Sequence, residues 1–406
     1  MSSPRSRFVL GVLVVSAACA VGAAASQQQT QGAGPAYKKV GSWGTLGTGD
    51  GQFGRNAYGL VTDKSGNVYV ADSDNHRIQV FTSKGTFVRK IAWPASEVVE
   101  DVAIDPEGST WATSLQGAQA RQFTANGQPA ASVTTPKSAG GIGIDGEGNV
   151  YVSTSGDNIQ AVVRFDKTPS GWEQGKTWGG FQEPGDVEVS ADGSIYVADR
   201  RGAPPNVKRF DSTGKLLKTI KLQMPATAGA GALYGIGVDL DCNVWATNAV
   251  QRNLVKYSPA GKLLATATSG DLIGQDVAVG PKGDLYVFDS GSRSVIHFAE
   301  DRSKPATAAV PGVLVATKGG SGYVVKVKYA LTGVACPAQI DATASLAGKG
   351  IAGKAKVKVA AGKTTVIQIP VKAADGTSAS ATFKIVLKTN GRATTQTRAV
   401  KVSVPA

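Results

Sequence analysis

Histidine is the scarcest chemically active side chain in this sequence, which has only His76 and His297 among 406 residues. Catalytic zinc sites usually need three protein ligands rich in histidine, so a site of this kind is excluded. The sequence also lacks a nucleophile elbow, a P-loop, a dinucleotide fingerprint and an HExxH motif. These absences favour binding over catalysis. Either histidine could serve as a general base, but a structural role in a strand or turn is the simpler interpretation.

Cysteine is almost as rare, with Cys19, Cys242 and Cys336 as the only three. Cys19 lies in a leader that we expect to be removed, and the other two lie in different regions. Two cysteines do not make a disulfide framework, although an exported protein can pair them. We expect two free or buried thiols, with a bridge between the regions as the alternative.

The N-terminal residues have the parts of a secretory signal. Two arginines precede an apolar stretch at 8–21, and Ala23-Ala24-Ala25 offers an A-x-A cleavage site. The alternatives are an uncleaved anchor, for which a span of about 20 apolar residues is needed, and a lipoprotein site at Cys19. We expect cleavage after residues 1–25, a disordered lead-in at 26–35, a secreted or cell-envelope location, and no transmembrane span in the mature protein.

Charged residues make up only 18% of the sequence, whereas glycine is frequent, with 51 residues. Frequent glycine and repeated valine-rich runs indicate β structure with many turns. The net charge is +13, and residues 306–406 account for +12 of it, with 14 Lys and Arg against two acidic residues. The last hundred or so residues therefore form a separate basic region, while residues 26–305 are close to neutral.

A unit with four strand patterns recurs along the chain. A turn glycine marks each unit, except that cysteine replaces it in the fifth: Gly66, Gly108, Gly148, Gly193, Cys242 and Gly283. An aromatic residue follows each marker by three positions: Tyr69, Trp111, Tyr151, Tyr196, Trp245 and Tyr286. A second aromatic ends each third strand pattern: Phe81, Phe123, Phe165, Phe210, Tyr257 and Phe298. Such a repeat is typical of a β-propeller blade. We interpret the aromatics as packing residues between blades and expect a modified turn at the cysteine, because a glycine there can take a positive φ.

The ring of blades needs a closing strand. The sixth unit has three strand patterns and stops near Glu300, whereas a spare strand pattern at 36–44 precedes the first unit. We expect this segment to supply the outermost strand of the last blade, which joins the two ends of the ring and protects its edges. The predicted fold is all-β, with a six-bladed β-propeller over 36–303.

The first unit carries the residues of a known repeat. The segments 47–53, 59–63 and 67–72, and above all Asn75-His76-Arg77-Ile78, resemble the NHL repeat, and the other units depart from it at the Asn-His position. The resemblance implies an NHL-type propeller of the exported bacterial kind, a fold that hosts many functions. Some propellers similar to this family are zinc lyases, and lactonase-type propellers use a central Ca²⁺.

From about residue 304 the strand period changes. Seven strand patterns follow, at 313–317, 323–331, 339–346, 355–360, 364–371, 381–388 and 398–404. They predict a basic immunoglobulin-like β-sandwich over 304–406. Lysine alternates with apolar residues at 325–328 and 354–358, which places each lysine set on one strand face. That face is either a surface for an anionic envelope polymer or a solvated face that discourages edge pairing. Nucleic acid is disfavoured, because stacking aromatics are few.

Glycine and aspartate alternate at the residue that opens the innermost strand of each unit: Gly59, Asp101, Gly141, Asp186, Gly235 and Asp276. Regular blades would bring the three carboxylates together near one mouth of the channel. Oxygen-rich sites suit hard cations, so the three aspartates are candidate ligands for calcium at the axis. The alternative is that each carboxylate accepts hydrogen bonds from nearby backbone N–H groups.

Other polar and aromatic residues are expected on the same axial face. The candidate ligand-binding residues are Tyr58, Asp72, Glu100, Asp199, Tyr234, Asn248 and Asp289. Asp63, Asp105, Asp145 and Asp239 lie at the opposite turns and are interpreted as turn-formers. The sequence predicts a monomeric, exported, non-enzymatic binding or scaffold protein that binds a protein, peptide or glycan on this face. A divalent-cation-dependent hydrolase or lyase is the alternative.

Overall fold

The computed structural model describes residues 37–156, 159–224, 230–300, 313–319, 322–330, 339–360, 364–372, 378–389 and 392–403. The predicted signal, the lead-in and Cys336 lie outside these residues. The described parts are all-β, and their only helical elements are two short 3-10 turns, η1 (Ser73–Asn75) and η2 (Ala230–Ala232). Neither has the length or apolar character that a helix needs to cross a membrane.

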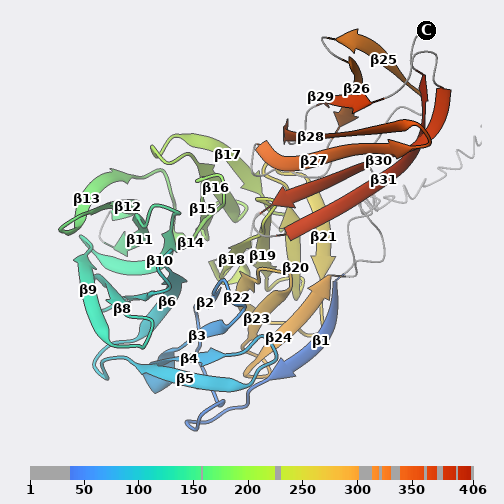
Figure 1. Cartoon of the computed structure of the whole chain (residues 1–406). Helices are drawn as coiled ribbons and strands as arrows, with labels where there is room; N and C mark the ends of the chain where they lie inside the picture. Colours follow the sequence, from blue (N-terminus) through green and yellow to red (C-terminus); the bar gives the residue numbers. More distant parts are fainter. Residues whose placement is uncertain are drawn as a thin grey trace, which may run out of the picture. The chain divides into compact units, whose positions relative to one another are not determined.

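Six four-stranded antiparallel sheets, called blades below, are arranged around a common centre (Figure 1). The first two are β2 (Leu60–Thr62), β3 (Val68–Asp72), β4 (Arg77–Phe81), β5 (Phe87–Ala92), and β6 (Val99–Ile104), β7 (Thr110–Ser114), β8 (Gln119–Phe123), β9 (Pro129–Thr134). The third and fourth are β10 (Ser138–Ile144), β11 (Val150–Gly156), β12 (Ile159–Thr168), β13 (Gly171–Trp178), and β14 (Pro184–Val189), β15 (Ile195–Asp199), β16 (Asn206–Phe210), β17 (Leu216–Lys221). The fifth is β18 (Ile236–Val238), β19 (Val244–Asn248), β20 (Asn253–Tyr257) and β21 (Leu263–Ala267). The first strand of each blade contacts the first strand of the next, so the innermost strands form a closed ring.

The last blade combines both ends of this ring. It contains β22 (Gly274–Val279), β23 (Leu285–Asp289), β24 (Ser294–Glu300) and, at its outer edge, β1 (Tyr37–Trp43). β1 runs antiparallel to β24, with Tyr37 opposite Glu300 and Trp43 opposite Val295. This is the pairing expected for the spare strand pattern, and it connects the first described strand to the last blade of the ring.

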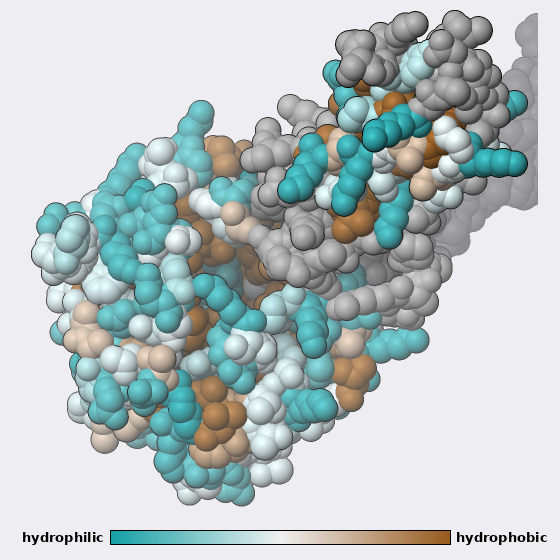
Figure 2. Space-filling view, in the orientation of Figure 1, coloured by the Kyte–Doolittle hydropathy of each residue, from teal (hydrophilic) through white to brown (hydrophobic). Residues whose placement is uncertain are grey.

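Apolar residues are buried between neighbouring blades in six clusters. Each cluster joins the marker aromatic of one blade to the third-strand aromatic of the next, as Tyr69 and Phe123 show between the first two blades. All of the repeat aromatics are buried. The second strands β3, β7, β15, β19 and β23 are buried at every residue, because blades cover them on both faces. The aromatic repeat therefore forms the packing between blades, while hydrophilic residues, teal in Figure 2, cover much of the outer surface.

The turn aspartates bind the backbone of their own turns, as predicted. Asp63 Oδ1 accepts the N–H groups of Ser65 and Asn67 at 2.9 and 2.8 Å. Asp105, Asp145 and Asp239 accept equivalent backbone bonds. These residues therefore set the register of each hairpin and take no part in the axial face.

Cys242 corrects two expectations. Its N–H donates to Asp239 O at 2.9 Å, the bond that Gly66 makes to Asp63 O at 3.0 Å. Cys242 reaches this geometry at φ +55°, compared with +85° at Gly66. The turn at Cys242 thus makes the same hydrogen bond as the turn glycines of the other units, at a smaller positive φ, and the expected modification of the turn is absent. Cys242 is also disulfide-bonded, so the expectation of free or buried thiols is wrong at this residue.

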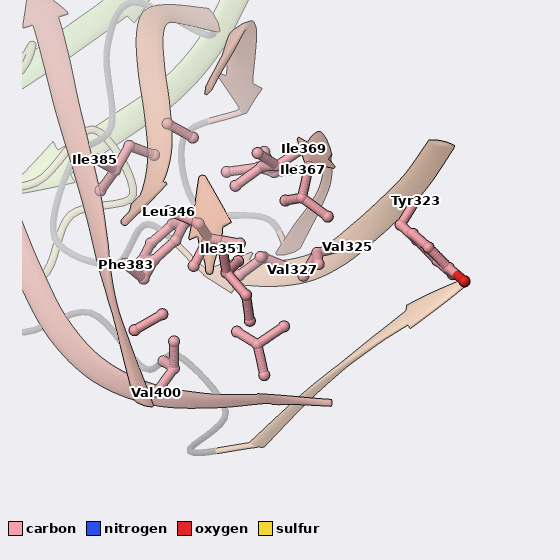
Figure 3. Packing of buried hydrophobic residues seen from close by; sticks show 14 residues of the cluster. Tyr323, Val325, Val327, Leu346, Ile351, Ile367, Ile369, Phe383, Ile385 and Val400 are labelled. Carbon is pink, nitrogen blue, oxygen red and sulfur yellow. The ribbon is translucent and has the colours of Figure 1, made fainter. Parts of the chain in front are cut away.

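The C-terminal strands form one sheet that closes on itself in the order β25-β26-β29-β28-β27-β30-β31. The seven strands are β25 (Val313–Gly319), β26 (Gly322–Ala330), β27 (Gln339–Gly348), β28 (Ile351–Ala360), β29 (Thr364–Lys372), β30 (Ser378–Thr389) and β31 (Arg392–Ser403). Their interior is a cluster of buried apolar residues that includes Val325, Leu346 and Phe383 (Figure 3). Alternation is clear on β26, where Val325 and Val327 are buried and Lys326 is exposed.

Candidate functional site

A cavity of about 520 Å³ lies where the innermost strands of the six blades meet. Every blade contributes to its wall. The lining residues used below are Tyr58, Glu100, Asp101, Gly140, Gly141, Ser155, Glu183, Asp186, Arg200, Tyr234, Gly235 and Asp276. Its volume falls in the range of small-molecule sites, about 300–1,000 Å³.

Three of the seven predicted ligand-binding residues lie on this wall: Tyr58, Glu100 and Tyr234. The other four, Asp72, Asp199, Asn248 and Asp289, do not line it. They end the second strands of their blades, where their side chains are buried. The structure therefore assigns these four to the framework around the cavity.

The aspartates among them hold the segment that leads into the inner strand. Asp199 Oδ1 accepts the N–H of Gln182 at 2.9 Å, and Asp289 Oδ1 accepts that of Ile273 at 2.8 Å. Asp72 Oδ1 accepts the N–H of Gly54 at 2.8 Å. Buried carboxylates need such partners, so these residues position the chain just before the cavity residues.

The three axial aspartates each bridge two blades. Asp101 Oδ1 accepts the N–H of Val102 at 2.7 Å, and its Oδ2 accepts the N–H of Ile142 in the next blade at 2.8 Å. Asp276 Oδ1 likewise accepts the N–H of Val277 at 2.7 Å, and its Oδ2 accepts the N–H of Leu60 in the first blade at 2.6 Å. Asp186 Oδ2 accepts the N–H of Ile236 at 2.7 Å. The carboxyl groups thus serve as hydrogen-bond acceptors that join neighbouring inner strands.

The alternating glycines make room for these carboxyl groups. A Cβ on Gly59 would lie 2.5 Å from both the Cα and Oδ1 of Asp101, closer than side chains tolerate. Gly141 and Gly235 approach Asp186 and Asp276 in the same way. The Gly–Asp alternation is therefore one steric unit, in which each glycine accepts the aspartate of the following blade.

Burial and mutual proximity raise the pKa of each axial carboxyl group. Burial, then the charge of Asp186, raises the pKa of Asp101 and of Asp276 well above its ordinary value. Burial raises the pKa of Asp186 to about 6, and hydrogen bonds to the other two side chains limit this rise. Glu188, two residues along β14, has its pKa raised by burial and by the charges of Asp186 and Asp101. Burial and the neighbouring negative charges therefore favour the protonated forms of these groups.

Glu100 and Arg200 form the charged part of the cavity wall. Burial raises the pKa of Glu100 to about 7, against the opposing charge of Arg200. Glu100 Oε2 is buried and has no hydrogen-bond partner among the described residues. Arg200 lies 3.7 Å from Glu183 Oε1 through its Nε, and its Cζ stacks 5.6 Å from the ring centre of Tyr234. Arg200 was not among the sequence candidates, and Glu188 was missed although it shares the strand face of Asp186.

Both histidines have structural partners, as the simpler interpretation predicts. His76 ends η1 at φ +48°, and its Nδ1 bonds Glu97 O in the next blade at 2.9 Å. His297 on β24 stacks on Tyr286, with ring centres 4.6 Å apart. Neither lines the cavity. Within the described ranges, no group of three or more His, Cys, Asp or Glu side chains is arranged to hold a metal ion.

Comparison with known proteins identifies one repeat family in part of the chain. Residues 56–81 match the family model of the NHL repeat. No curated protein matches the sequence. Similar solved structures include a streptogramin B lyase, at 12% identity and TM-score 0.48 over 65% of this chain and 97% of that chain.

Two further structures are similar to a comparable degree. One is a catalytically inactive virginiamycin B lyase from Staphylococcus aureus with quinupristin, at 15% identity and TM-score 0.48 over 72% of this chain and 95% of that chain. The other is the WD40 β-propeller domain of Doa1, at 13% identity and TM-score 0.48 over 67% of this chain and 100% of that chain. Likeness at this level carries no argument about activity. The chain is thus an all-β protein that contains an NHL repeat at residues 56–81, within four-stranded sheets of the β-propeller kind.

Proposed function

We propose that this protein is an exported binding or scaffold protein whose protein, peptide or glycan ligand enters the axial cavity of a six-bladed β-propeller. The observation that carries this proposal is the cavity, to which every blade contributes and in which Glu100 retains an unpaired buried oxygen. Leaving a buried acceptor unpaired costs about 1–3 kcal/mol. A ligand that donates a hydrogen bond to Glu100 relieves this cost, which favours binding at the axis.

Thermal-shift screening of the full mature chain against peptide and glycan libraries tests this proposal. A ligand present at one hundred times its Kd should stabilise the protein by about 2.7 kcal/mol. The shift should disappear in Glu100→Ala and persist in Glu147→Ala, which removes an exposed acid from a turn. Ligands that shift wild type and Glu100→Ala equally would place binding elsewhere and contradict the proposal.

For residues 304–406 we propose an immunoglobulin-like sandwich that holds the protein near an anionic envelope polymer. Its strands fall into two groups with long antiparallel pairings, joined only by three residue pairs between β25 and β31 and two between β28 and β29. This division resembles the two sheets of a sandwich. Ser345 of β27 lies opposite Lys354 on one side and Lys384 on the other. The exposed Lys354, Lys356 and Lys384 therefore share one sheet face.

Retention on cell-wall pellets at increasing salt tests the tether. Charge-driven binding weakens with ionic strength, so Lys354→Ser/Lys356→Ser/Lys384→Ser should elute at lower salt than wild type. The matched control, Lys84→Ser/Lys218→Ser/Lys262→Ser, removes equal charge from exposed positions on the blades. Equal elution of both variants, or retention unaffected by salt, would rule the tether out.

The alternative is a divalent-cation-dependent hydrolase or lyase that works at the axial face. It draws support from the convergence of Asp101, Asp186 and Asp276 on the cavity wall. Metal analysis of the purified protein decides between the two functions. A stoichiometric cation that is lost in the triple Asp→Asn variant would favour the enzyme, whereas metal-free protein of normal stability would remove it.

A further inference from the structure

Two charged residues on different blades line the cavity. Glu100 stands on the second blade and Arg200 on the fourth. The third blade, between them, contributes Gly140, Gly141 and Ser155 to the wall. The cavity is therefore a space with a hydrogen-bond acceptor on one blade and a donor on another.

Both bounding groups retain unused hydrogen-bonding capacity. Glu100 Oε2 and Arg200 Nε are buried, and neither makes a hydrogen bond in the part of the chain that the structure describes. The nearest acidic partner of Arg200 Nε is Glu183 Oε1, at 3.7 Å, which is an ion pair without a hydrogen bond. A ligand that donates to Glu100 and accepts from Arg200 would satisfy both groups at once.

Two tyrosines supply flat apolar surface beside this space. Tyr58 and Tyr234 line the cavity from the first and fifth blades, each one residue before a ring glycine, and both are half-buried. Burial, then the charges of Glu100 and Asp74, raise the pKa of Tyr58, with a smaller influence of Tyr234. Aromatic rings with polar tips contact ligands that are apolar on one face and polar at the edge.

The charges around the space argue against a charged ligand. An anion would meet the carboxyl groups of Glu100 and Glu183. A cation would meet the guanidinium of Arg200. A hydroxyl group both donates and accepts hydrogen bonds, so a neutral polyhydroxylated molecule fits the paired acceptor and donor without an electrostatic penalty.

We propose that the axial cavity binds a neutral saccharide residue, with adjacent hydroxyl groups between Glu100 and Arg200 and the ring face against Tyr58 or Tyr234. This inference rests on the proposed binding function and selects the glycan among its ligand classes. The cavity volume of about 520 Å³ suits one or two sugar rings.

Saturation-transfer NMR with the full mature chain tests the inference with sugars that share one ring and differ in one substituent. The probes are glucose and N-acetylglucosamine, which are neutral, glucosamine, which is cationic, and glucuronate, which is anionic. The neutral sugars should bind with a Kd on the order of 1 mM, as expected for so small a ligand. The charged sugars should bind at least about tenfold more weakly. One unfavourable charge contact of about 1.4 kcal/mol corresponds to this factor in Kd.

Variants then locate the site. Arg200→Ala and Tyr234→Ala should each weaken binding of the neutral sugars about tenfold or more, whereas Tyr234→Phe should retain it because the ring is kept. Arg55→Ala is the matched control, since it removes an exposed arginine that does not line the cavity. Thermal unfolding of each variant identifies any that fails to fold, and Tyr234→Phe remains informative in that case.

The outcomes separate this inference from the function on which it rests. Tighter binding of glucosamine or glucuronate, or sugar binding unchanged in Arg200→Ala, would overturn the neutral saccharide. A peptide ligand that is lost in Arg200→Ala, with no sugar bound, would overturn it while the binding function stands. If no ligand of any class responds to Arg200→Ala or Glu100→Ala, both proposals fail.

Discussion

Single residues at the axis act in pairs across blade boundaries. Asp101 accepts the N–H of Ile142 in the following blade, and the Cα of Gly59 in the preceding blade lies against its backbone. The aspartate gains partners only because the glycine offers no Cβ in its way. Substitution of the glycine should therefore be as harmful as loss of the carboxyl group.

Gly59→Ala tests this steric pairing. Its Cβ would lie 2.5 Å from Asp101 Cα, which is backbone and cannot rotate away. We expect a loss of about 1–3 kcal/mol in the free energy of unfolding, as for other overpacked sites. Gly146→Ala is the control, because nothing lies within 4 Å of its added Cβ. Urea denaturation should show the second variant within about 1 kcal/mol of wild type, and equal losses would refute the pairing.

Cys242 offers a second prediction at this scale. Because it is disulfide-bonded, it should not react with a thiol reagent in the denatured, unreduced protein and should react fully after reduction. The chain has two other cysteines, Cys19 and Cys336, so peptide mapping without reduction identifies the partner. Labelling of Cys242 before reduction would show that the thiol is free. Cys242→Ser, which cannot form the bond, provides the control digest.

Among the elements, β1 has the largest separation in sequence from its partner. It pairs with β24 and carries Trp43 against the first blade and the last, with ring centres 6.1 Å from Phe81 and 5.9 Å from Tyr286. One residue thus packs on both sides of the point where the ring closes. Loss of that contact should loosen the closure more than loss of an exposed residue of the same strand.

Trp43→Ala should lower the free energy of unfolding by about 2–4 kcal/mol, somewhat less than a fully buried tryptophan because Trp43 is half-buried. Val40→Ala on the same strand is the control, since Val40 is 57% exposed, and it should stay within about 0.5 kcal/mol of wild type. Chemical denaturation followed by tryptophan fluorescence and circular dichroism provides the measurement. A Trp43→Ala protein as stable as Val40→Ala would show that closure does not depend on this contact.

At the scale of the whole molecule, the axis brings together carboxyl groups from three blades, Asp101, Asp186 and Asp276, whose pKa values are raised. Asp101, Asp276 and Glu188 have their pKa values raised well above the ordinary range, and Asp186 and Glu100 have theirs raised to about 6 and 7. The folded protein therefore binds more protons here than the unfolded chain does. By linkage, the stability contributed by these groups is complete below the unfolded pKa and is lost as pH rises through the folded pKa.

Glu188→Gln should consequently flatten the pH dependence of stability. Between about pH 4.3, the unfolded value of a glutamate, and pH 7.5, wild type should lose more free energy of unfolding than the variant, because glutamine needs no proton in this half-buried position beside Asp186. Asp211 and Glu107, whose pKa values are lowered, act in the opposite direction in both proteins, so the difference between the two profiles isolates the axis. Parallel profiles for wild type and Glu188→Gln would contradict a raised pKa at Glu188, and Glu147→Gln serves as the exposed control.

The local features of this fold could be predicted because they depend on short-range periodicity. The turn aspartates bind residues two and four positions away, and the repeat aromatics follow from strand alternation. The candidate site was predicted in part, with Tyr58, Glu100 and Tyr234 on the cavity wall. Strand alternation could also have predicted Glu188, because it lies two residues from Asp186 on the same strand. No local sequence pattern predicts that Arg200 lines the cavity.

By itself, the sequence determined the strands, the turns, the repeat and the Gly–Asp alternation, because each is encoded within one unit of the chain. Only the tertiary structure decided which polar residues face the cavity. Three of them belong to the framework because their carboxylates accept hydrogen bonds from backbone N–H groups in the segments that lead into the inner strands. These residues are Asp72, Asp199 and Asp289. The pKa values of the axial aspartates are raised because three separate inner strands, β6, β14 and β22, bring these side chains together at the axis. This proximity depends on residues far apart in the sequence, so no single unit encodes it.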